Sequence, residues 1–135
     1  MKTDPAFGNP GGKRPLEGCR VLIVEDEYFQ AREIALALGR AGAEVVGPTA
    51  RAQEVEQLVR SGGIDAAMLD INLGDGASFE VARSMRELSV PFLFLTGYDV
   101  SIFPDDLSDR PRLEKPVDQE RLIERLAELV GAKAS

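Results

Sequence analysis

Short apolar runs alternate with longer amphipathic segments along most of the chain. Five runs have the length and composition of buried strands: RVLIV (20–24), AEVVG (43–47), DAAMLDI (65–71), VPFLFLTG (90–97) and RLEKP (112–116). Four segments repeat apolar residues at helical spacing: 31–38, 52–59, 81–88 and 122–130. Continuous apolar strands that alternate with helices are typical of a parallel sheet covered on both faces. The pattern therefore predicts an α/β domain.

Two segments depart from this alternation. Residues 1–18 hold three prolines and four glycines, the composition of a mobile tail or linker, so we expect a tail at 1–18 and a domain at 19–132. Residues 98–111 hold two prolines and four aspartates with little helical periodicity, which predicts a short, irregular or mobile fourth helix. Asp118 is placed to cap the last helix. The stretch after Val130 is too short for an output domain, so we expect a single-domain protein.

Composition narrows the class of protein. The single cysteine, Cys19, excludes an internal disulfide, and the absence of histidine excludes His-based triads and imidazole zinc sites. A formal net charge of −7 disfavours nucleic acid as a partner. No apolar run approaches the roughly 20 residues of a membrane span, and the N-terminus has no signal-peptide core. We expect a cytoplasmic protein that binds neither nucleic acid nor membrane.

Reactive or ion-binding side chains follow four of the five predicted strands. Glu25 and Asp26 follow the first strand, Asp70 ends the apolar part of the third, Thr96 ends the fourth and Lys115 ends the fifth. The carboxyl ends of parallel strands meet at one edge, where ligands bind. Taken singly, such acids often cap helices, a threonine is often a strand residue and a lysine is often solvated. The joint pattern instead favours a site.

The chemistry of that site follows from its groups. Three close carboxylates form a hard, oxygen-rich site that suits Mg²⁺, and the ion would relieve the repulsion within the acidic run Glu25–Glu27. Asp70 lies on the central strand before a glycine-rich turn, so it is the candidate nucleophile toward a phosphoryl group. Thr96 and Lys115 would neutralise phosphoryl oxygens.

Over residues 20–131, this combination resembles the receiver domain of bacterial two-component response regulators. The resemblance implies a flavodoxin-like (βα)5 fold, a doubly wound five-stranded parallel sheet in the order 2-1-3-4-5. It also implies that Asp70 accepts phosphate from a phosphohistidine of a histidine kinase or phosphotransfer protein, with Thr96 and Lys115 on the phosphoryl group. The Lys-Pro peptide bond before Pro116 is typically cis in this family. The implied Mg²⁺ ligands are Glu25, Asp26, Asp70 and the backbone carbonyl of Asn72.

Two departures from the family pattern stand out. Arg112 occupies a position where many receivers carry an aromatic residue that swings inward on activation. The run from Phe94 to Tyr98, FLTGY, resembles the "FAT GUY" subgroup with leucine in place of alanine. That subgroup has a poorly formed element after the fourth strand, partners of the HWE kinase type and many stand-alone members. Gly97, Tyr98 and Pro116 are candidate switch or access residues, with Tyr98 gating phosphate, contacting a partner or simply packing at the surface.

These patterns favour a single-domain response regulator that catalyses only its own phosphorylation and dephosphorylation. Its output would be phosphorylation-dependent binding to an unidentified downstream protein, or service as a phosphate sink. Three alternatives remain open: a receiver module from a hybrid kinase or larger regulator, a Mg²⁺-dependent phosphohydrolase, and a phosphate-independent scaffold. Asn72 stands where such a hydrolase would carry a second acid, and the complete set of site residues disfavours the scaffold.

Overall fold

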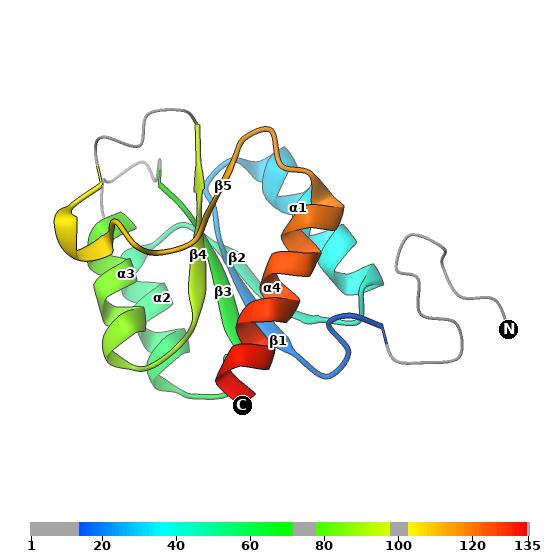
Figure 1. Ribbon diagram of the computed structural model, residues 1–135, viewed down its shortest axis with the longest axis horizontal. Coiled ribbons are helices and arrows are strands. Elements are labelled where there is room, and N and C mark those ends of the chain that lie inside the picture. The colour runs from blue at the N-terminus through cyan, green and yellow to red at the C-terminus, as the bar shows by residue number, and fades with distance from the viewer. Residues whose placement is uncertain (1–13, 72–77, 98–102, 135) are drawn as a thin grey trace, which may run out of the picture.

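The computed structural model describes residues 14–71, 78–97 and 103–134. Five parallel strands form one sheet in the order β2-β1-β3-β4-β5, which confirms the predicted flavodoxin-like topology (Figure 1). The strands are β1 (Arg20–Val24), β2 (Glu44–Thr49), β3 (Ala66–Asp70), β4 (Phe92–Thr96) and β5 (Arg112–Glu114).

Helices cover both faces of the sheet because successive strand residues point to opposite sides. Leu22 and Val24 of β1 belong to the core beneath α2 and α3, whereas Val21 and Ile23 belong to the core beneath α1 and α4. Figure 1 shows these two helix pairs on opposite sides of the strands. The helices are α1 (Tyr28–Arg40), α2 (Ala52–Arg60), α3 (Ser78–Glu87) and α4 (Gln119–Ala134).

Local chemistry sets several element boundaries. Asp118 Oδ1 accepts hydrogen bonds from the backbone nitrogens of Glu120 at 3.0 Å and Arg121 at 3.3 Å, which confirms the predicted cap of α4. Strand β2 continues to Thr49, two residues past its predicted end. Gly47 permits this with a φ of +90°, and a Cβ there would lie 2.9 Å from the carbonyl oxygen of Ile23.

The described part of the segment between β4 and β5, residues 103–111, is irregular, as predicted. Within the described residues 103–111 the only helical element is a 3₁₀ turn at Asp105–Leu107. Phe103 and Leu107 bury their side chains in the core, and both carboxylate oxygens of Asp106 receive hydrogen bonds from Arg83 at 2.9 and 3.1 Å. The turn is therefore held against α3. Its predicted mobility stays a prediction.

Residues 14–18 pack against the domain although their composition predicts part of a tail. Leu16 is fully buried in the core beneath α1 and α4, and its backbone nitrogen donates to the carbonyl oxygen of Ala41 at 2.9 Å. Because residues 1–18 are rich in proline and glycine, the sequence pattern predicts a tail and does not reveal that Leu16 is buried. None of the described helices combines the length and apolar character that a membrane span requires.

Candidate functional site

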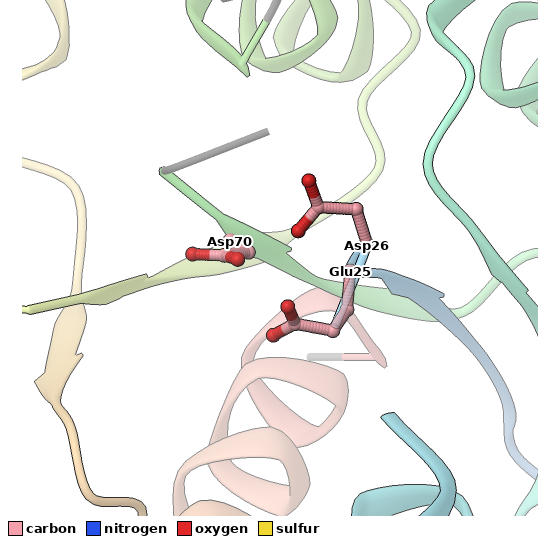
Figure 2. Close-up of side chains that lie close together, drawn as sticks. All are labelled: Glu25, Asp26 and Asp70. Atoms are coloured by element: carbon pink, nitrogen blue, oxygen red, sulfur yellow. The ribbon is translucent and has the colours of Figure 1, made fainter. Parts of the chain in front are cut away.

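Three carboxylates meet at the carboxyl ends of β1 and β3. Glu25 and Asp70 are almost completely buried, with 3% and 1% of their surfaces exposed, whereas Asp26 is exposed. One oxygen from each of the three carboxylates lies within 4.8 Å of the others. Figure 2 shows the side chains extending from the ends of these neighbouring strands. The fold thus brings together the three acids that the sequence singled out.

The ammonium group of Lys115, which directly follows β5, lies beside this cluster. Lys115 Nζ lies 2.9 Å from Asp70 Oδ1 and 3.9 Å from Glu25 Oε1. The backbone nitrogen of Lys115 donates to the carbonyl oxygen of Thr96 at 2.8 Å, which fixes the lysine beside the end of β4. The Lys115–Pro116 peptide bond is cis, the form that the resemblance implies. Thr96 is buried as the last residue of β4.

The carboxylate of Glu25 is held by two donors from the start of α1. Its Oε2 accepts from the backbone nitrogen of Glu27 at 3.0 Å, and its Oε1 accepts from Gln30 Nε2 at 2.7 Å. Burial raises the pKa of Glu25 to about 7, with a further increase from the neighbouring Asp70. The Glu27 backbone and the charge of Lys115 oppose that increase.

Glu27, the third acid of the run, caps helix α1 and is not part of the carboxylate cluster. Its two carboxylate oxygens accept from the backbone nitrogens of Phe29 at 3.1 Å and Gln30 at 2.9 Å, so Glu27 is the N-cap of α1. The cap interpretation of these acids therefore holds for Glu27. Glu25 and Asp26 contribute their carboxylates to the cluster.

The donor set fits a magnesium ion. All three groups are carboxylates, which are hard oxygen ligands, and two of them are buried with their charges close together. Burial, and secondly the adjacent Asp70, raise the pKa of Glu25, and a divalent cation would favour its ionised form again. When bound, Mg²⁺ would neutralise charge on the carboxylates and on a phosphoryl oxygen.

The structure describes two of the four remaining candidate residues, Gly97 and Pro116. Gly97 directly follows Thr96 and is half-buried, and Pro116 is exposed next to Lys115. Asn72 and Tyr98 lie outside the described residues. The proposed roles of these four residues in metal binding, switching or access stay predictions.

Two residues at the site were not predicted. Gln30 contacts Glu25 from the first turn of α1, and Ser78 contacts the backbone of Asp70 from the start of α3. The sequence signal for both is weak: an amide five positions after an acid, and a hydroxyl in a turn three positions before the predicted helical stripe at 81–88. Neither pattern is specific, because the partner of each side chain depends on the packing of the helix against the sheet.

Comparison with known proteins identifies the family. The model of the response regulator receiver domain matches residues 21–127, so the chain belongs to that family. The sensory transduction protein LytT of Bacillus cereus is 29% identical over 122 residues, which cover 86% of this chain and 49% of LytT. The sensor protein TorS of Escherichia coli K12 is 30% identical over 118 residues, which cover 83% of this chain and 13% of TorS.

Among solved structures, SdrG from Sphingomonas melonis Fr1 is 34% identical to the chain with a TM-score of 0.71. That match covers 83% of this chain and 96% of SdrG. By contrast, the chain spans half or less of the curated relatives LytT and TorS. The family is a signalling module of two-component systems, and its members typically bind Mg²⁺.

Proposed function

We propose that this receiver accepts a phosphoryl group on Asp70 in a Mg²⁺-dependent reaction and signals through the phosphorylated form. The observation that carries this proposal is the juxtaposition of the buried Asp70 with two further carboxylates within 4.8 Å and with Lys115 Nζ at 2.9 Å. Negative and positive groups that converge on one buried carboxylate suit the transfer of a charged phosphoryl group better than they suit plain structural packing.

The transfer requires one bond to form and one to break. An oxygen of Asp70 attacks phosphorus, the bond between phosphorus and the donor histidine nitrogen breaks, and its electron pair stays on the imidazole. Lys115 is close enough to Asp70 to neutralise negative charge on the aspartyl phosphate. The hydroxyl of Thr96, at the adjacent strand end, would donate a hydrogen bond to a phosphoryl oxygen. Asn72 would supply its backbone carbonyl to the metal.

The donor would be a histidine kinase or a histidine phosphotransfer protein. The run from Phe94 to Tyr98 resembles the FAT GUY signature with leucine at position 95, and the irregular conformation of the described residues 103–111 supports that resemblance. On this basis we propose a kinase of the HWE type and a stand-alone cytoplasmic regulator. Gly97, Tyr98 and Pro116 would control access to the phosphoryl group. The output would be binding to a downstream protein or withdrawal of phosphate from the kinase.

Beryllofluoride, an acyl phosphate mimic, tests the proposed acceptor without a kinase. In two-dimensional NMR spectra with Mg²⁺, we expect saturable shifts of the Thr96 and Lys115 amides in the wild-type chain and none in Asp70→Asn. Omitting Mg²⁺ should abolish the shifts. Identical shifts in the wild type and in Asp70→Asn would show that the ligand binds elsewhere, and the acceptor assignment would fail.

A further inference from the structure

Ser78, the first residue of α3, directs its side chain back to the end of β3. The residue is 1% exposed, and its Oγ lies 3.0 Å from the carbonyl oxygen of Asp70 and 2.7 Å from that of Ile71. A hydroxyl carries one hydrogen, so the two carbonyls share it as acceptors. These bonds join the two ends of the connection between β3 and α3.

The direction of these bonds is unusual for a serine at a helix start. A capping serine accepts a hydrogen bond from a backbone N–H of the helix that it begins. The Ser78 hydroxyl instead donates to carbonyls of the preceding strand end. Its partners therefore include the backbone of Asp70 itself.

The peptide group between Asp70 and Ile71 is consequently held on two sides. Its carbonyl oxygen accepts from Ser78, and its nitrogen donates to the carbonyl oxygen of Leu95 in β4 at 3.0 Å. The Asp70 side chain projects from this fixed peptide toward Lys115, 2.9 Å away. Small displacements of a reacting group, on the order of 1 Å, lower reaction rates strongly.

We propose that Ser78 is a positioning residue for the phosphoacceptor. By holding the carbonyls of Asp70 and Ile71, its hydroxyl sets where the Asp70 carboxylate stands relative to Lys115 and to the metal-binding acids. Ser78 does not touch the transferred group; it acts through the backbone. This inference rests on the proposed phosphorylation of Asp70.

A pair of variants of equal shape separates the hydroxyl from the packing. Ser78→Thr keeps the hydroxyl and adds a methyl group. Ser78→Val has the same shape as the threonine variant but lacks the hydroxyl. We would measure the rate of phosphorylation by acetyl phosphate at saturating Mg²⁺ by intact-protein mass spectrometry, well below each variant's melting temperature. Ser78→Thr should react within about twofold of wild type, and Ser78→Val about tenfold more slowly.

Two further variants complete the comparison. Ser78→Ala removes the hydroxyl without adding volume and should be slowed like Ser78→Val. Ser84→Ala removes a hydroxyl that bonds Glu56 in α2, away from Asp70, and should react at the wild-type rate. A purely structural hydroxyl would lower the melting temperature without changing the rate of the folded protein.

The outcomes keep the two claims separate. A wild-type rate for Ser78→Ala, or equal rates for the Thr and Val variants, would overturn the positioning role while leaving the phosphorylation of Asp70 intact. A wild-type chain that acetyl phosphate leaves unmodified, and that does not bind beryllofluoride, would overturn the proposed function and the positioning role with it.

Discussion

Glu25 is the residue whose ionisation the site alters most. Its pKa lies near 7 instead of 4.5, chiefly because the side chain is buried and secondly because Asp70 is adjacent. Between these two pH values the folded chain binds more protons at Glu25 than the unfolded chain does. The metal-free protein therefore loses stability as pH rises through this window. A bound cation would offset this loss of stability because it favours the ionised carboxylate of Glu25.

Magnesium affinity should accordingly depend on pH through Glu25. We expect binding to strengthen from pH 6 to pH 8, because the proton on Glu25 competes with the metal below pH 7. Calorimetric titrations with Mg²⁺ at both pH values would measure this change. Glu25→Gln should flatten the pH dependence and stabilise the metal-free protein at pH 8. An equally steep pH dependence in the variant would assign the titration to another group.

Asp26 and Glu27 should differ sharply despite being neighbours. Asp26→Asn removes a carboxylate from the cluster, so Mg²⁺ binding should weaken by roughly tenfold or more with little change in stability. Glu27→Gln alters the cap of α1, so it should lower the free energy of unfolding by about 0.5–1 kcal/mol and leave Mg²⁺ affinity within about twofold. Equal losses of affinity in the two variants would contradict the division of roles between these acids.

At the scale of elements, several contacts hold the described residues 103–111 between β4 and β5. Phe103 packs against Phe94 at a centroid distance of 4.9 Å, Asp106 pairs with Arg83, and the Arg112 guanidinium lies 4.6 Å from the centroid of the Phe103 ring. Hydrogen bonding to Arg83 lowers the pKa of Asp106 to about 2. This ion pair thus contributes above pH 4 and is lost toward pH 2, although its exposure keeps the contribution small.

Arg112 should stabilise this segment without taking part in the chemistry. Arg112→Ala removes the contact with Phe103 and a hydrogen bond to the carbonyl oxygen of Ser108. We expect amide exchange in residues 103–108 to accelerate roughly two- to fivefold, since an exposed cation–π contact contributes about 0.5–1 kcal/mol. The rate of phosphorylation by acetyl phosphate should stay unchanged. A collapse of that rate would give Arg112 a role at the site.

For the molecule as a whole, the sequence pattern predicts two features: the order of strands and helices, and the residues that lie at the strand ends. Apolar strands alternating with helical stripes predict the parallel sheet, and the rule that strand ends meet predicts the approach of Asp70, Glu25 and Lys115. Contacts that depend on the packing of one element against another do not follow from local patterns. Gln30 and Ser78 acquire their partners only when α1 and α3 dock on the sheet.

Leu16 offers a test of where the packed part of the chain begins. Leu16→Ala should lower the free energy of unfolding by roughly 2–4 kcal/mol, because the side chain is fully buried in the core. Leu88→Ala, at a position that is 37% exposed, is the matched control and should cost less than about 1 kcal/mol. Urea denaturation of the three proteins gives both values. Equal stabilities would place Leu16 outside the core.

The central claim is that Asp70 takes up a phosphoryl group with the help of Mg²⁺. The most direct test is intact-protein mass spectrometry after incubation with acetyl phosphate, with and without Mg²⁺, on the wild type and on Asp70→Ala. We predict the mass gain of one phosphoryl group that requires both Mg²⁺ and Asp70 and is labile as an acyl phosphate. An adduct of equal yield on folded Asp70→Ala would contradict the account.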